Sequence, residues 1–171
     1  MQFELKRITK EGVPAALQKA ERYRLLNEPS AAESICLDVL EVEPDHQQAL
    51  VTLLLAIVDE FGEGVYEGTS EGTRRAREVL SRVRDEYKRN YYSGIICERR
   101  GKAQIRQGHP RSAESAYSWL REAMEWYEKA EAMRPPGNDE AILRWNTCAR
   151  ILARNPSLAP RVEESYEPSL E

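Results

Sequence analysis

Hydrophobic residues recur along most of the chain with the period of an α-helix. One long stripe contains Ala113, Ala116, Tyr117, Leu120, Ala123, Met124, Tyr127 and Ala130. Strict alternation of apolar and polar residues is nowhere sustained, so the pattern predicts an all-α fold without strands. Seven helices are expected, over about residues 14–26, 30–43, 45–61, 73–89, 91–107, 112–133 and 138–154. The third is apolar almost all round, which is typical of a central helix covered by its neighbours.

Turn and capping residues separate these stretches. Ser30 is expected to cap the second helix, with Glu33 three residues later completing a capping box. Four glycines between Gly62 and Gly72 predict an exposed, mobile loop before the fourth helix. The last stretch, 155–171, contains three prolines and four glutamates and is expected to be a loose acidic tail.

Small and apolar residues also repeat at matching intervals along the chain. The residues Ala32, Cys36, Val39 and Pro44 are separated by four, three and five positions, and Ala123, Tyr127, Ala130 and Pro135 show the same separations. Ala20 lies twelve residues before Ala32, and Gly101 lies twelve before Ala113. This spacing resembles the tetratricopeptide repeat (TPR), in which small residues let paired helices approach closely and a proline ends the second helix.

The resemblance implies a solenoid of three helix pairs plus a C-terminal capping helix. Its units would cover 13–46, 47–89 and 90–136, with the cap at 138–154, inside a single domain over 1–154. Ala32 is expected to be buried between two closely packed helices. In this family the first helix of each pair lines a concave groove that binds peptides or partner proteins. The chain is therefore expected to be an adaptor or scaffold rather than an enzyme.

The resemblance also names the expected groove residues. They are Leu17, Glu21, Arg24, Val51, Leu55, Asp59, Arg99, Lys102, Arg106, Asn146 and Arg150. Family members that bind the C-terminal tails of chaperones hold the terminal carboxylate with lysines, asparagines and an arginine. Leu17, Glu21, Thr52 and Ile95 stand at four of those places and only Arg99 fits, so this chain is not expected to bind such tails.

Charge is distributed very unevenly along the chain. Residues 1–73 carry a net charge of −8, residues 74–111 carry +8, and residues 112–171 carry −4. The basic block 74–111 is either a solvated face with local salt bridges or a patch that faces an acidic peptide, another subunit or nucleic acid. An overall pI of about 5.5 makes nucleic acid the weaker alternative. A small secretion-type chaperone that sequesters an apolar client segment is a further alternative.

Composition limits the remaining function classes. Charged residues make up 32% of the chain and apolar residues 41%, as in soluble globular proteins. Three cysteines without paired spacing and two histidines give no disulfide framework, metal site or cofactor site. No catalytic motif occurs. Without an apolar N-terminal segment or a span of membrane length, the chain is expected to be cytoplasmic.

Overall fold

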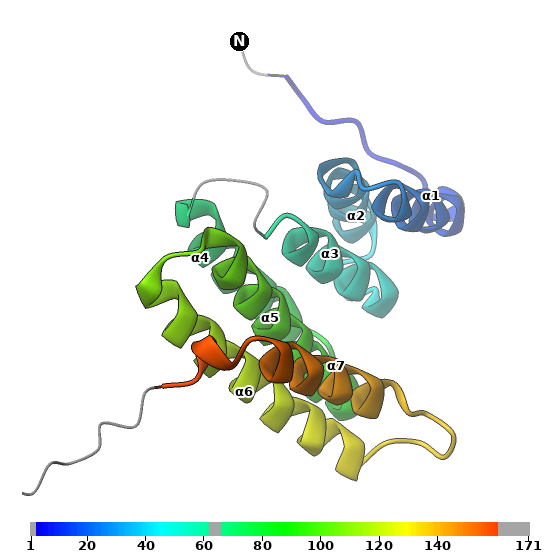
Figure 1. Ribbon diagram of the computed structural model, residues 1–171. Helices are drawn as coiled ribbons and strands as arrows, with labels where there is room; N and C mark the ends of the chain where they lie inside the picture. The colour runs from blue at the N-terminus through cyan, green and yellow to red at the C-terminus, as the bar shows by residue number, and fades with distance from the viewer. Residues whose placement is uncertain (1–2, 62–65, 161–171) are drawn as a thin grey trace, which may run out of the picture.

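The computed structural model describes residues 3–61 and 66–160 of this protein, and they form an all-helical fold without a strand (Figure 1). The α-helices are α1 (Val13–Leu25), α2 (Pro29–Val42), α3 (Gln47–Asp59), α4 (Tyr66–Ser81), α5 (Glu86–Gln107), α6 (Pro110–Ala132) and α7 (Glu140–Arg154). Two short 3-10 helices, η1 (Lys10–Gly12) and η2 (Pro156–Leu158), precede and follow them. The predicted all-α class is confirmed.

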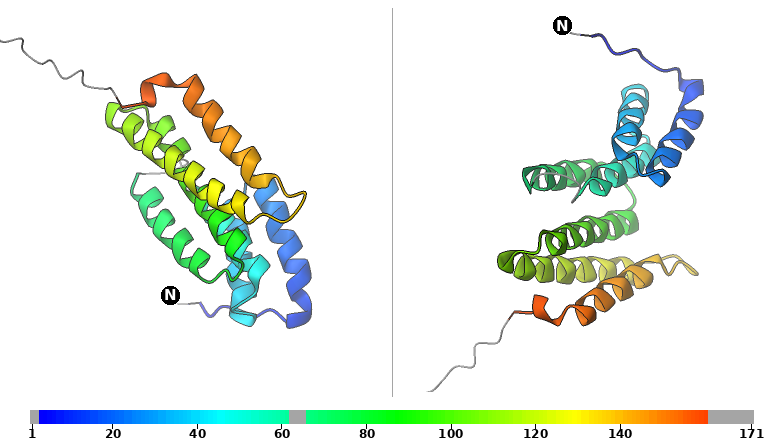
Figure 2. Two further views of the ribbon diagram at one scale, coloured as in Figure 1. Left: turned by 90° about the horizontal axis from the view of Figure 1, so that it is seen from below. Right: turned by 45° about the horizontal axis from the view of Figure 1, so that its top comes forward.

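The helices pack in chain order. Each α-helix contacts the one that follows it, and α1 also contacts α3, as α3 does α5. Figure 2 (right) shows this succession from the N-terminal helices at the top to α7 at the bottom. Helix α3 buries eight of its thirteen residues, which confirms its predicted central position. No helix in the described part of the chain is both long and apolar enough to cross a membrane.

The prediction of a glycine-rich loop over residues 62–72 is wrong for residues 66–72. Tyr66–Gly72 belongs to α4, and residues 62–65 lie outside the described residues. Gly72 is buried, and a Cβ there would lie 2.7 Å from Cε1 of Phe61. This glycine therefore permits close packing against an aromatic ring, whereas it was expected to lie in an exposed loop.

The boundary between the fourth and fifth helices was also misplaced. Helix α4 ends at Ser81 rather than Arg89, and α5 begins at Glu86 rather than Tyr91. Asp85 caps α5 by accepting a hydrogen bond from the backbone N–H of Lys88 at 2.8 Å. An Asp directly before a helix satisfies one of its free N–H groups, so Asp85 was the available signal.

Two smaller expectations need correction. Helix α2 begins with Pro29 at its first turn and Ser30 is not its cap; Glu33 instead pairs with Arg75 of α4. The stretch after Asn155 is not wholly loose, because Leu158 in η2 is 8% exposed and η2 packs on α6 and α7. Residues 161–171 of the expected tail lie outside the described residues.

Among the helices that the structure describes, α5 and α6 share the most extensive contact, and it includes two buried glycines of α5. A Cβ on Gly94 would lie 2.4 Å from Cε1 of Tyr127, and a Cβ on Gly101 would lie 2.8 Å from Cγ of Leu120. Both glycines thus let a large side chain of α6 reach the backbone of α5. This tight seam fixes the position of α5, which carries several of the predicted groove residues.

Oppositely charged parts of the sequence meet within the fold. Arg75 pairs with Glu33, Arg84 approaches Asp45 at 3.4 Å, and Arg99 approaches Asp59 at 3.3 Å. Arg82 donates a hydrogen bond to the backbone carbonyl of Pro44. Much of the basic block therefore attaches α4 and α5 to the acidic first half of the chain.

Candidate interaction site

Five of the predicted groove residues surround one cavity of about 360 Å³. It is lined by Arg24, Leu25, Asn27, Asp59, Phe61, Arg99, Lys102 and Arg106. These residues come from the C-terminal ends of α1 and α3, with the residues just after them, and from the C-terminal half of α5. We call this set the cationic cavity.

Asp59 ties the three helices together at the cavity wall. Its Oδ2 accepts from Nε of Arg24 at 2.8 Å, and Nη2 of Arg24 lies at the same distance. Its Oδ1 lies 3.3 Å from Nη2 of Arg99. The Asp59 side chain is 16% exposed, so both oxygens are engaged in a partly desolvated site. One carboxylate therefore orients two guanidinium groups from α1 and α5.

Lys102 forms an ion pair with Glu98, whose carboxylate is almost completely buried. Its Nζ donates to Oε1 of Glu98, which also lies 3.4 Å from Nη1 of Arg144 on α7. Oε2 of Glu98 accepts a hydrogen bond from the Tyr127 hydroxyl at 2.7 Å. Burial, followed by the charge of Glu98, raises the pKa of Tyr127, so this hydroxyl stays protonated and keeps donating.

Glu98 belongs to the basic block's own segment and pairs with Lys102, as the expected local salt bridges imply, but it does so in the interior rather than on a solvated face. Glu98 is 0% exposed. It shares one helical face with Gly94 and Gly101, at i−4 and i+3. In the sequence, two glycines on the same helical face as Glu98 were the available signal that this face packs closely against another helix.

Arg106 completes the cavity at the C-terminal turn of α5. Its Nη1 donates to the backbone carbonyl of Phe61 at 3.3 Å. Four cations, Arg24, Arg99, Lys102 and Arg106, and one carboxylate, Asp59, line the cavity, which leaves a charge of +3. The buried Glu98 is shared by Lys102 and Arg144 and does not change this excess. Leu25 borders the same cavity with 88% of its surface exposed. The site thus combines a positive hollow with an exposed apolar side chain.

The other predicted groove residues do not line this cavity. Leu17 is 3% exposed and belongs to the core, so it is not available as a contact surface. Glu21 accepts a hydrogen bond from Nε2 of Gln48 at 2.8 Å. Val51 and Leu55 are half-buried against the core. On α7, Asn146 is half-buried and Arg150 is exposed.

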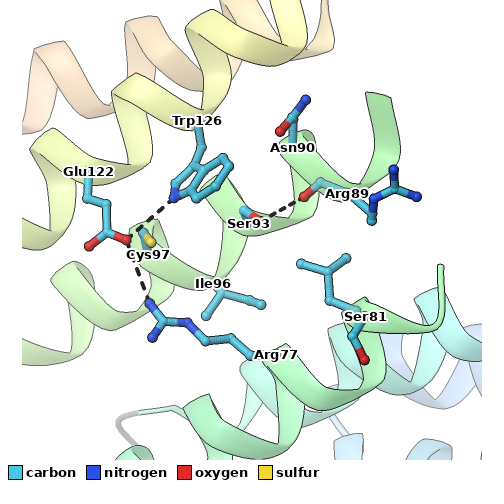
Figure 3. A pocket seen from close by; sticks show the side chains of 10 residues that line it. Arg77, Ser81, Arg89, Asn90, Ser93, Ile96, Cys97, Glu122 and Trp126 are labelled. Atoms are coloured by element: carbon cyan, nitrogen blue, oxygen red, sulfur yellow. Dashed lines mark hydrogen bonds and ion pairs between the residues drawn. The ribbon is translucent and has the colours of Figure 1, made fainter. Parts of the chain in front are cut away.

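A second cleft, of about 490 Å³, lies between α4, α5 and α6 (Figure 3). In it, Arg77 and the indole of Trp126 both point toward the Glu122 carboxylate, with Oε1 at 3.7 Å from Nη2 of Arg77 and 3.4 Å from Nε1 of Trp126. Arg89 turns away to donate to the carbonyls of Val83 and Arg84. Two arginines and one carboxylate line this cleft, a charge of +1 against +3 at the cationic cavity, so the cleft offers less to an anion.

The tyrosines next to Arg89 pack inside the molecule. The ring of Tyr91 lies edge-on to Tyr92 at 5.1 Å and tilted against Tyr127 at 5.9 Å. Both Tyr91 and Tyr92 are half-buried against the core. This arrangement agrees with a packing role and does not present a stacking platform for bases.

Comparison of the chain with protein-family models, curated proteins and solved structures finds no match.

Proposed function

We propose that this protein is a TPR-like helical-repeat adaptor that binds a segment of a partner protein in the cationic cavity. The repeat-like arrangement is supported by serial packing of the helices. It is also supported by burial of the recurring small residues, since Ala20, Ala32, Ala123 and Ala130 are each 0% exposed. In such a solenoid the odd-numbered helices would line the groove, and α1, α3 and α5 supply the cavity.

The observation that carries the proposal is the convergence of four cations from α1 and α5 around one hollow. Three of them are oriented by Asp59 or Glu98, so their positions are fixed before a partner arrives. Ordering them in advance lowers the entropic cost of binding. The residual charge of +3 favours an acidic group, and exposed Leu25 favours an apolar side chain next to it.

A protein segment fits this site better than nucleic acid does. Nucleic-acid affinity rests on many phosphate contacts along a basic stripe, whereas much of this basic block is paired within the chain. The cavity is also small, at about 360 Å³. It matches one or two acidic side chains rather than an extended phosphate backbone.

An NMR titration tests the proposal. The probe is a dodecapeptide of alternating Glu and Leu, added to the full-length ¹⁵N-labelled chain. The expected result is a set of shift changes centred on Leu25, Asn27 and Lys102, with binding that weakens as salt is raised.

Two charge-reversal variants provide the matched comparison. Arg106→Glu is expected to weaken peptide binding by roughly tenfold or more, equivalent to about 1.4 kcal/mol. Arg111→Glu makes the same change at an exposed position outside the cavity and is expected to leave affinity within about twofold. Equal losses in both variants would show general charge attraction and would contradict a defined site.

A further inference from the structure

We propose that the chain's own residues 161–171 dock in the cationic cavity and compete there with the partner segment. This inference rests on the site described under the proposed function and adds its regulation. The occupant is chosen by three observations: its charge, the place where the described chain ends, and its length.

The segment has the composition that the cavity favours. Residues 161–171 contain one arginine and four glutamates, a side-chain charge of −3, against +3 at the cavity. Tyr166 and Leu170 are interspersed among the glutamates and could cover Leu25. The segment therefore pairs acidic and apolar groups, as does the kind of partner that the site accepts.

The described chain ends close to the basic end of α5. Asn155 and residues 157–160 line a hollow together with Ile105, Gly108 and His109, which belong to the end of α5 and the turn after it. Ile105 is the direct neighbour of Arg106. Pro160, the last residue described before the segment, therefore borders the same hollow as the helical turn that carries one of the cavity's cations.

The remaining length is sufficient to cover the site. Eleven residues can extend to about 36–40 Å. The seven residue steps from Arg99 to Arg106 rise only about 10 Å along α5. The segment can therefore reach all three α5 cations and still extend toward Leu25 on α1.

Paramagnetic NMR of the full-length chain tests this docking. Ser165→Cys adds a thiol that can carry a nitroxide label. The three native thiols are 0–1% exposed, and burial raises the pKa of each to about 12, so they are not expected to react at neutral pH. The expected result is broadening of the amide signals of Leu25, Arg99 and Arg106, which disappears in about 1 M salt.

A second variant separates a specific contact from proximity. Glu163→Gln, Glu164→Gln and Glu167→Gln, combined with the label, should abolish the broadening and increase the affinity for the Glu–Leu peptide by about threefold or more, because the competitor is removed. Broadening that persists in this variant, or that centres elsewhere, would overturn the proposal.

Mixing labelled ¹⁴N chains with unlabelled ¹⁵N chains identifies the molecule that supplies the segment. Broadening in this mixture equal to that of the singly labelled chain would mean that a second copy is the occupant, which overturns docking within one chain.

The experiments also distinguish failure of the self-docking inference from failure of the proposed function. If residues 161–171 dock in the native sequence but the Glu–Leu peptide does not bind the variant with Glu163, Glu164 and Glu167 changed to Gln, only the proposed adaptor function is contradicted. If the peptide binds and no broadening occurs, the self-docking inference fails alone.

Discussion

Glu98 binds side chains of α5, α6 and α7 at once. A buried carboxylate is costly unless it is paired and fully hydrogen-bonded. Here Lys102, Arg144 and Tyr127 supply three partners from three helices. The lysine that faces the cavity is therefore positioned by a network whose other members lie inside the molecule.

Tyr127→Phe removes one of these partners without changing the ring. We expect a loss of about 1.5–3 kcal/mol in the free energy of unfolding, because one oxygen of a buried charge loses its donor. Urea denaturation followed by circular dichroism measures it. Tyr117→Phe, on the same helix and half-exposed, is the control and should change stability by less than about 0.5 kcal/mol. Equal effects of the two variants would contradict a specific Tyr127–Glu98 bond.

The buried thiols predict a loss of stability at alkaline pH. Burial raises the pKa of Cys36, Cys97 and Cys148 to about 12 from an ordinary value of about 9. Above pH 9 the unfolded chain therefore releases protons that the folded chain retains. The stabilisation is complete below pH 9 and is lost as pH rises toward 12, by roughly 1.4 kcal/mol per thiol and pH unit.

This dependence is measured as the free energy of unfolding from pH 8 to pH 11. Cys148→Ala should make the decline less steep by the contribution of one thiol, whatever its effect on stability at pH 8. An unchanged slope would show that the Cys148 thiol ionises as readily in the folded chain as in the unfolded one.

At the scale of the helices, two glycines decide how closely α5 and α6 approach. Alanine favours a helix over glycine by about 1 kcal/mol, so a Gly→Ala change would stabilise α5 if space allowed. At Gly94 the added Cβ would lie within 3 Å of three ring atoms of Tyr127. The ring cannot move without also disturbing its bond to Glu98.

Gly94→Ala is therefore expected to destabilise the protein by about 1–3 kcal/mol despite the gain in helix propensity. Thermal and urea unfolding both report it. The control, Ser118→Ala, alters an exposed position of α6 and should have an effect within about 0.5 kcal/mol. Stabilisation by Gly94→Ala would show that the α5–α6 seam is looser than described.

The helices show where sequence reasoning succeeds and where it fails. Periodicity predicted all seven helices because each buries a stripe of apolar residues. The start of α4 was misplaced because Gly72, which packs against Phe61, was interpreted as part of an exposed loop. A glycine needed for close contact and one needed for a turn look the same in a sequence. Only the position of Phe61 in space distinguishes them.

At the scale of the whole molecule, folding brings basic residues of the block 74–111 next to acidic residues of the first half of the chain. Pairs such as Arg75–Glu33 and Arg84–Asp45 join the basic block to the acidic first half. A local excess stays at the C-terminal half of α5, where Arg99, Lys102 and Arg106 line one cavity with Arg24. The uneven charge is thus mainly a means of assembling the helices, with a local excess at the cationic cavity.

The candidate site was predictable in part. Arg24, Asp59, Arg99, Lys102 and Arg106 were expected to face one groove, and they line one cavity. The bordering Leu25 and the supporting Glu98 were not predicted. Leu17 was assigned to the groove although it is buried, because the rotation of α1 about its own axis depends on packing against α2 and η1. Helical spacing fixes which residues share a face, and tertiary contacts decide which way that face points.

Photo-crosslinking in the cells of origin tests the central claim most directly. A photoreactive amino acid is placed at Leu25, which borders the cavity, or at Leu143, an exposed leucine of α7 that does not line it. The account predicts a discrete protein adduct from position 25 that is lost when Arg106→Glu is added and retained with Arg111→Glu. Adducts of equal yield from both leucines, or an adduct from position 25 that survives Arg106→Glu, would contradict the cationic cavity as the partner-binding site.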